Sequence, residues 1–166
     1  IVSRGRDGGY TLKLPTEETR LHTRSQFMAE LAGMLGGYAA EKEVFGDVST
    51  GASNDLKVAS ELARKLVTKY GMSEKLGPMT FGKSEELIFL GREISTEKNY
   101  SEKVAAEIDE EVSGFMKRAY ELATKIVSGR AKALSAIAKA LIEKESLEHE
   151  EFYKLLKPFR LKPLAL

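Results

Sequence analysis

Apolar side chains recur at helical spacing through residues 101–127, and this long period constrains the fold more than any other feature of the sequence. Intervals of three and four residues place such side chains on one face of an α-helix. Ser101 is a suitable N-cap, and Gly129 is a suitable stop. The stripe consists of Val104, Ala105, Ile108, Val112, Phe115, Met116, Ala119, Tyr120, Ala123, Ile126 and Val127. We therefore predict a mostly α domain with one long helix over this range.

Further helices are predicted on both sides of this one. One runs from an N-cap at Ser25 to about Phe45, and a second ends near Tyr70, where Gly71 stops it. The first contains three glycines, each of which costs about 1 kcal/mol relative to alanine inside a helix. They indicate either close approach of another backbone or a local kink, and they are Gly33, Gly36 and Gly37. Two more helices are predicted, over about 131–145 and from Ser146 onward.

The N-terminal region carries the β signals of the chain. Residues 10–14 alternate in a β-favouring pattern after the turn signal Gly8-Gly9, and Pro15 stops the pattern. We predict a hairpin or an edge strand there, so the fold class is mostly α with a small β element near the N-terminus. The chain starts at Ile1 without an initiator Met or a charged-then-apolar leader, and we expect it to be a piece of a longer protein.

Composition excludes several classes of function. The net charge is +1, which gives no general reason to expect nucleic acid or an anionic membrane as a partner. Cysteine is absent, which excludes a disulfide scaffold, a Cys-ligated zinc site and a thiol nucleophile. The two histidines, His22 and His149, lie too far apart in sequence for a local His-x-x-x-His pair, and we expect both to be solvated. The chain has no phosphate-binding loop and no dinucleotide fingerprint.

The most informative segment is residues 49–56, Ser-Thr-Gly-Ala-Ser-Asn-Asp-Leu. It is a turn of small residues that leads into a helix, in which Ser53 or Asn54 can cap a free backbone N–H. Asp55 then lies in the first turn, where the helix macrodipole favours a negative charge. A carboxylate at that position can equally be presented to a metal ion that another helix holds.

The same run resembles the T-G-A-S-N-D-[LI] signature of the FtsH family, the membrane-anchored AAA+ zinc metalloproteases. Residues 35–41, Leu-Gly-Gly-Tyr-Ala-Ala-Glu, resemble the family's L-G-G-R-A-A-E, with Tyr38 in place of the common Arg. Other segments match in order: residues 9–15, 44–46, 70–78, 89–91, 108–112 and 141–147. The resemblance covers residues 2 to 156.

This resemblance implies a zinc site that the chain shares with an upstream helix. In the family that helix carries H-E-x-x-H, whose two His bind Zn²⁺ and whose Glu is the general base that activates a metal-bound water for attack on the peptide bond. The third ligand falls on Asp55, and Ser53 and Asn54 are candidates for hydrogen bonds around it. H-E-x-x-H is absent here, so no catalytic residue is expected within the chain, and the chain alone is expected to be inactive.

The resemblance further implies a parent protein that degrades membrane and soluble proteins as a homo-hexamer. ATP and Mg²⁺ enter only through an ATPase domain, and the membrane only through transmembrane segments, none of which these 166 residues contain. The parent is expected in the bacterial inner membrane with this domain on the cytoplasmic side, and the chain itself is expected to be soluble. We expect a peptidase domain over 1–156 and a C-terminal tail over 157–166.

Two expectations have alternatives. A peptidase can hold its substrate as a strand added to a free edge, which nominates the substrate residues Tyr10, Thr11, Leu12, Lys13 and Leu14. The same residues can instead form a hairpin that covers the core. The alternative to a catalytic role is a non-catalytic helical assembly module that forms the protease ring. The glycine-containing helix and the long helix would then be the packing surfaces between subunits. Both helices can instead pack in the core of one subunit.

Overall fold

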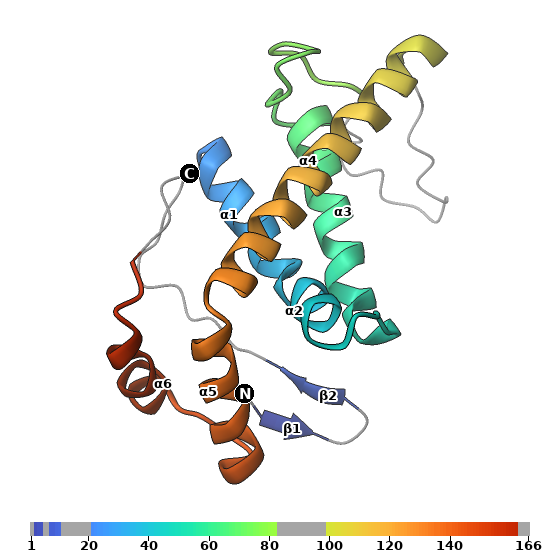
Figure 1. Ribbon diagram of the computed structural model, residues 1–166. Coiled ribbons are helices and arrows are strands. Elements are labelled where there is room, and N and C mark those ends of the chain that lie inside the picture. The colour runs from blue at the N-terminus through green and yellow to red at the C-terminus, as the bar shows by residue number, and fades with distance from the viewer. Residues whose placement is uncertain (1, 5–6, 11–20, 83–98, 163–166) are drawn as a thin grey trace, which may run out of the picture.

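The computed structural model describes residues 2–4, 7–10, 21–82 and 99–162 of the chain, and these segments are mostly helical (Figure 1). In chain order the elements are β1 (Val2–Arg4), β2 (Asp7–Tyr10), α1 (Arg24–Met34), α2 (Gly36–Phe45), the 3-10 turn η1 (Thr50–Ala52), α3 (Ser53–Thr68), α4 (Glu102–Gly129), α5 (Ala131–Lys144), α6 (His149–Leu156) and the 3-10 turn η2 (Lys157–Phe159). The predicted fold class, mostly α with a small β element near the N-terminus, is confirmed. None of the described helices combines the length and the apolar character that a membrane span requires.

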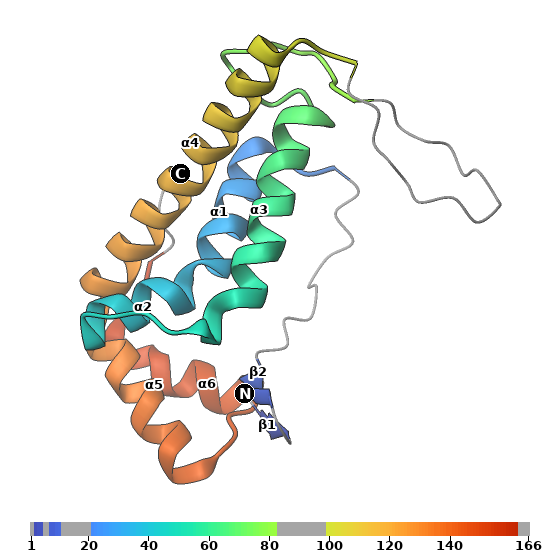
Figure 2. The same ribbon diagram turned by 90° about the vertical axis from the view of Figure 1, so that its right-hand side faces the viewer.

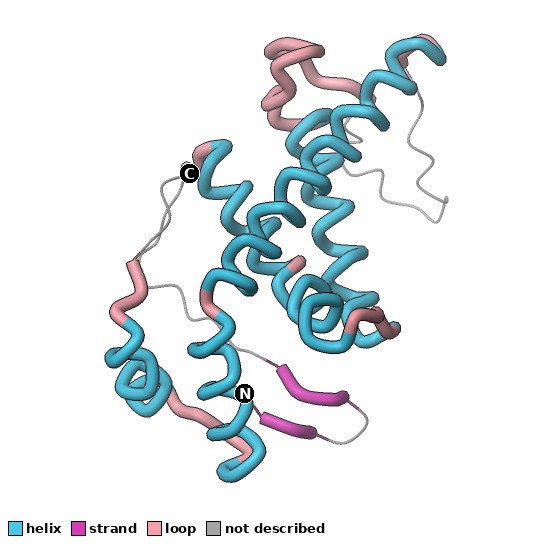
Figure 3. The backbone as a smooth tube through the Cα atoms, viewed as in Figure 1, coloured by secondary structure: helices cyan, strands magenta, loops and turns pink. Residues whose placement is uncertain are grey.

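The β element is a two-stranded antiparallel hairpin of β1 and β2. Val2 pairs with Tyr10 and Arg4 pairs with Asp7, so β2 contains one residue more than β1 between the two pairs, which makes a bulge. Figure 3 shows these strands as the only magenta segments of the described backbone. The predicted strand over residues 10–14 overlaps the hairpin only at Tyr10, and residues 11–14 lie outside the described residues.

α1 begins with a capping box at Thr23, two residues before the predicted N-cap Ser25. The hydroxyl of Thr23 accepts a hydrogen bond from the Gln26 backbone N–H at 3.2 Å, and the Gln26 side-chain oxygen accepts one from the Thr23 N–H at 2.7 Å. The prediction of Ser25 as the N-cap is therefore wrong. A capping box needs Glu or Gln three residues after the cap, and Gln26 stands in that relation to Thr23.

The first predicted helix is broken into α1 and α2 at Leu35, which confirms the local kink. Leu35 is buried, and its N–H still donates to the Leu31 carbonyl at 3.0 Å. A Cβ atom built on Gly36 or Gly37 would meet nothing within 4 Å. Close approach of another backbone, the other reading of this glycine cluster, therefore does not explain these two positions.

The core forms where α1, α2 and α3 pack against α4 (Figure 2). Its buried members come from all four helices and are Leu31, Ala32, Leu35, Ala39, Ala59, Ala63, Leu66, Val67, Ile108, Phe115, Ala119 and Ala123. The four that belong to α4 are members of the predicted stripe, and Ser101 caps α4 as expected by accepting from the Val104 N–H at 3.3 Å. Periodicity thus identified the face of α4 on which the fold is built.

The loop after α3 is fastened to α4 by a serine. Ser73 is buried, and its hydroxyl donates to the Glu111 carboxylate at 2.6 Å while it accepts from the Leu76 N–H at 2.9 Å. The Lys75 ammonium lies 2.5 Å from the Glu110 carboxylate, one position earlier on α4. These bonds fix the chain where it leaves α3, so that the loop shields the end of the core.

The guanidinium groups of two arginines lie over the ring of Phe115, at the middle of α4. The guanidinium carbons of Arg24 and Arg118 lie 5.4 Å and 4.8 Å from the ring centroid, within the range of cation–π attraction. Arg24 also pairs with Glu74, and this hydrogen bond holds the pKa of the Glu74 carboxyl below its usual value. One arginine of α1 thus joins the core ring to the loop after α3.

α5 and α6 lie beyond the C-terminal end of α4, away from the other helices (Figure 2). Ala133 is the buried residue of α5, whereas the apolar side chain of Ile142 on the same helix is 82% exposed. An ion pair of 2.7 Å between Lys144 and Glu151 joins α5 to α6. We call α5, α6 and η2 the C-terminal arm. The predicted domain limit between 156 and 157 falls inside it and stays a prediction.

The assignment of the α1 cap can be tested by matched alanine substitutions. Thr23→Ala removes the hydroxyl that accepts from Gln26 and is expected to lower the free energy of unfolding by about 1 kcal/mol. Ser25→Ala, two residues away, is expected to have a much smaller effect, because Ser25 is exposed and caps no backbone group. Urea unfolding measures both, and equal losses for the two variants would contradict the assignment.

Candidate functional site

The segment that carries the candidate ligand starts at the end of α2. Gly46 adopts a left-handed conformation with φ of 72° and ends the helix, a position that favours glycine because it has no Cβ. The Lys42 ammonium donates to the Gly46 carbonyl at 2.9 Å, which satisfies one of the free acceptors at this helix end. The chain therefore leaves α2 in a defined direction toward residues 47–52.

A carboxylate of α2 holds this loop in place. Glu41 accepts a hydrogen bond from the Ser49 hydroxyl at 2.6 Å and one from the Ser49 N–H at 3.0 Å. These two bonds, the hydroxyl first, hold the pKa of the Glu41 carboxyl below its usual value, against the smaller opposing effects of burial and of the Asp47 charge. The ionised carboxylate and the loop conformation therefore stabilise each other.

Ser49 also organises the turn that follows. Its hydroxyl accepts from the Gly51 N–H at 3.1 Å and so caps η1, which continues directly into α3. The predicted capping by Ser53 or Asn54 is not observed, because α3 follows Ala52 without any side-chain cap. The cap lies one turn earlier, on a serine that also binds Glu41. In the sequence, a Ser directly before Thr-Gly is a local signal for this cap. The contact of Ser49 with Glu41, eight residues upstream, has no such local signal.

Asp55 lies in the first turn of α3, with an exposed side chain. The backbone around it is anchored on both sides, since Ala52 is buried and Leu56 packs against the core. Ser53 and Asn54, the predicted neighbours, are exposed like Asp55. The arrangement presents three consecutive polar side chains from the anchored start of a helix.

The described residues do not form a metal site by themselves. Within them, no three His, Cys, Asp or Glu side chains come together as a group that could hold a metal ion. His22 and His149 are both exposed, as expected. The centroid of the His22 ring lies 5.3 Å from that of Phe27, and the centroid of the His149 ring lies 4.7 Å from that of Tyr153. Asp55 is thus a single candidate ligand, and one carboxylate does not make a zinc centre. No reaction step follows from these residues alone.

The other predicted binding element is described only in part. Tyr10 is the last residue of β2, which pairs with β1, whereas Thr11, Leu12, Lys13 and Leu14 lie outside the described residues. The expectation that residues 10–14 bind substrate as an added strand therefore stays a prediction.

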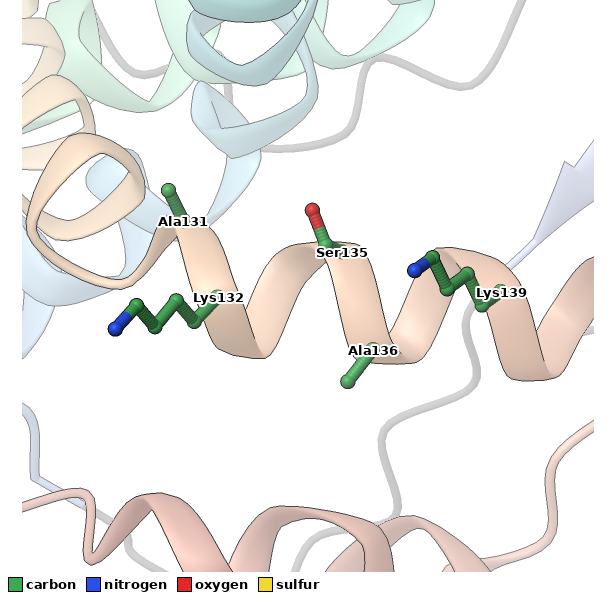
Figure 4. A pocket seen from close by; sticks show the side chains of 5 residues that line it. All are labelled: Ala131, Lys132, Ser135, Ala136 and Lys139. Atoms are coloured by element: carbon green, nitrogen blue, oxygen red, sulfur yellow. The ribbon is translucent and has the colours of Figure 1, made fainter.

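A hollow of about 380 Å³ lies along α5, and Asp55 is not among the residues that line it (Figure 4). It is lined by Lys132, Ser135 and Lys139 together with Ala131 and Ala136, all from this one helix. Nothing among the described residues forms a facing wall with polar groups, so this hollow offers no constellation for chemistry.

Comparison with known proteins gives a consistent result. The sequence profile of the family described as "Peptidase family M41" matches residues 1–155. The chain is 50% identical, over 93% of its length, to "ATP-dependent zinc metalloprotease FtsH 1" of Thermoanaerobacter sp. (strain X514). It is 51% identical, over 94% of its length, to "ATP-dependent zinc metalloprotease FtsH" of Caldicellulosiruptor bescii. In both cases it spans 25% of the relative, so the chain covers about a quarter of the length of these curated relatives.

The role of Glu41 predicts a distinct pH dependence of the loop. Because the folded-state pKa of Glu41 is lowered, its stabilising contribution is complete above the unfolded-state pKa and is lost as the pH falls through the folded-state value. In NMR titrations, the Ser49 amide resonance should shift with a midpoint below that of an ordinary glutamate. Glu41→Gln should remove this shift, and Glu43→Gln, on the same helix, should leave it unchanged. A Ser49 titration that persists in Glu41→Gln would disprove the link.

Proposed function

Because the chain belongs to the FtsH family, peptidase family M41, we propose that it acts as part of the peptidase domain of an ATP-dependent zinc metalloprotease. The main support is the family match over residues 1–155 together with 50% identity to a protein of that name. The proposed domain extends over 1–156, and residues 157–166 form a tail that follows it.

Asp55 is proposed to be one protein ligand of the zinc ion. An exposed carboxylate on an anchored helix start suits this role, because the backbone that carries it is held by the buried Ala52 on one side and Leu56 on the other. The Glu41–Ser49 bonds fix the loop that leads to it. Ser53 and Asn54 are proposed to donate hydrogen bonds that orient the Asp55 carboxylate.

The remaining ligands and the general base are proposed to come from an H-E-x-x-H element outside these 166 residues. The donor set of the chain supports this division. No three His, Cys, Asp or Glu side chains of the described residues form a group that could hold a metal ion, whereas zinc in peptidases commonly takes three protein ligands. When bound, zinc would supply an activated water for peptide hydrolysis. The proposed role of this chain in the site is to hold and orient one carboxylate, that of Asp55.

The substrates, cofactors, membrane anchoring and assembly of the whole protein are proposed on the same family match. Its substrates are proteins, held as an added strand along residues 10–14. ATP and Mg²⁺ act through an ATPase domain, transmembrane segments anchor the protein in the bacterial inner membrane, and the peptidase domains assemble as a homo-hexamer. The rival role, a purely structural assembly module, gains no support from the helices nominated for it, because α1 and α2 pack on α4 within one chain.

The assignment of Asp55 predicts the phenotype of a single substitution in the full-length protease. Asp55→Ala removes one direct ligand and is expected to lower zinc affinity by at least about 100-fold, the upper end of what loss of an outer-shell partner costs. Degradation of an unfolded test protein should be abolished, while ATP hydrolysis stays near the wild-type rate.

Asp47→Ala is the matched control, because Asp47 is an exposed aspartate of the loop that leads to α3. It should retain both zinc and proteolysis. Undiminished degradation by the Asp55→Ala protein would refute the assignment, and equal losses in both variants would show that the loop, not the ligand, is responsible.

The isolated 166-residue chain is expected to bind zinc only weakly, because it offers one ligand in place of three. Equilibrium dialysis with zinc, followed by metal analysis, measures this directly. A stoichiometric, tightly bound zinc that Asp55→Ala removes would contradict the proposed division of ligands.

A further inference from the structure

An apolar groove of about 490 Å³ lies between α1 and the C-terminal half of α4. The wall on the α1 side is made of Ala and Gly residues between positions 29 and 36. The wall on α4 carries larger apolar side chains, and its residues are Leu122, Ala123, Ile126 and Val127. Pockets that bind small molecules have volumes of about 300–1,000 Å³ and are mostly apolar. The groove therefore has the size and the lining of a ligand site.

The walls of the groove determine which occupant they can accept. A Cβ atom added to Gly36 would meet nothing within 4 Å, so the space beside this residue is open among the described residues. Both walls lack polar side chains, and helical backbone groups bond within their own helix. A peptide strand along these walls would bury N–H and C=O groups without partners, which is unfavourable. An alkyl chain has no such groups, and its burial is favourable.

Two cations line one edge of the groove. They are Arg130, which directly follows α4, and Lys162, and the Arg130 guanidinium donates a hydrogen bond to the Lys162 carbonyl at 2.5 Å. A guanidinium has five N–H donors, so others remain for a bound carboxylate. Among the described residues, neither cation forms an ion pair with a carboxylate, and none that lines the groove is acidic. This edge is therefore complementary to an anionic group.

We propose that this groove binds a single-chain fatty acid, whose alkyl chain lies along the apolar walls and whose carboxylate lies at Arg130 and Lys162. Apolar walls that end at a cationic edge match the two parts of such a ligand. A second copy of the chain fits less well, because a stable interface between proteins buries at least about 1,200 Å² in total, whereas this groove has the volume of a small-molecule pocket. Asp55 does not line the groove, so fatty-acid binding there is independent of the proposed zinc ligand.

Isothermal titration calorimetry of the 166-residue chain with sodium dodecanoate tests the proposal directly. One saturable site is expected, and decanoate and octanoate should bind more weakly, by roughly fourfold for each methylene removed. Decanol should bind about tenfold more weakly than decanoate, because it lacks the charge-assisted hydrogen bonds at the cationic edge. The absence of saturable binding, or binding that does not depend on chain length, would overturn the proposal. Decanol that binds as tightly as decanoate would remove the role of the cations and overturn it as well.

A pair of glycine substitutions assigns the binding to this groove. Gly36→Leu places a side chain in the groove and should lower the affinity for dodecanoate by at least about tenfold. Gly37→Leu is the matched control, since a Cβ at Gly37 also meets nothing within 4 Å but Gly37 does not line the groove. Circular dichroism checks that both variants keep their helices. Undiminished binding by the Gly36→Leu chain, or equal losses in the two folded variants, would contradict the assignment.

A substitution at the cationic edge separates the charge from the packing. Arg130→Gln should lower the affinity for dodecanoate by about tenfold and leave that for decanol unchanged. Lys132→Gln is the matched control, because Lys132 is an exposed cation of α5 that does not line the groove. Equal losses in these two variants would show a general charge effect and overturn the proposal. Analytical ultracentrifugation covers the rival occupant, since a dimer that Gly36→Leu dissociates would assign the groove to a second copy of the chain.

Discussion

The apolar face of α4 is the constraint on which the rest of the structure depends. Ile108, Phe115, Ala119 and Ala123 are buried along it, and α1, α2 and α3 all pack there. Phe115 supplies the largest buried side chain, while the alanines allow the partner helices to approach closely. Because this one face serves three helices, a change in its periodicity would displace α3, and with it the helix start that carries Asp55.

Two loops are fastened to helices by the same device. Ser49 donates its hydroxyl proton to Glu41 and accepts from the Gly51 N–H, and Ser73 does the same with Glu111 and the Leu76 N–H. In each case one hydroxyl joins a helix carboxylate to a backbone N–H that the loop would otherwise leave free. The first of these serines determines how the chain enters η1 and α3. The candidate site is therefore rigid for reasons that lie outside the site.

Periodicity and capping rules predicted much of the helical framework, and their failures have identifiable causes. The stripe of α4 and its cap at Ser101 were predicted correctly, because both depend on local spacing. The cap of α1 was misplaced from Thr23 to Ser25, although Gln26 completes the box only with Thr23. The helix over about 131–145 was predicted correctly as α5, yet its apolar residue Ile142 remains exposed. Periodicity identifies an apolar face, but not whether another element covers it.

The sequence by itself indicated the family, the mostly α fold class and the candidate zinc ligand Asp55, because each of these depends on short-range patterns. Only the tertiary structure decided how that residue is held. Glu41 reaches Ser49 because α2 ends at Gly46 and the chain folds back, which brings together residues eight positions apart. The groove beside Gly36 and the return of Lys162 to Arg130 likewise depend on how α1, α4 and the C-terminal arm meet in space. Long-range contacts of this kind follow from the packing of whole helices, which no local spacing encodes.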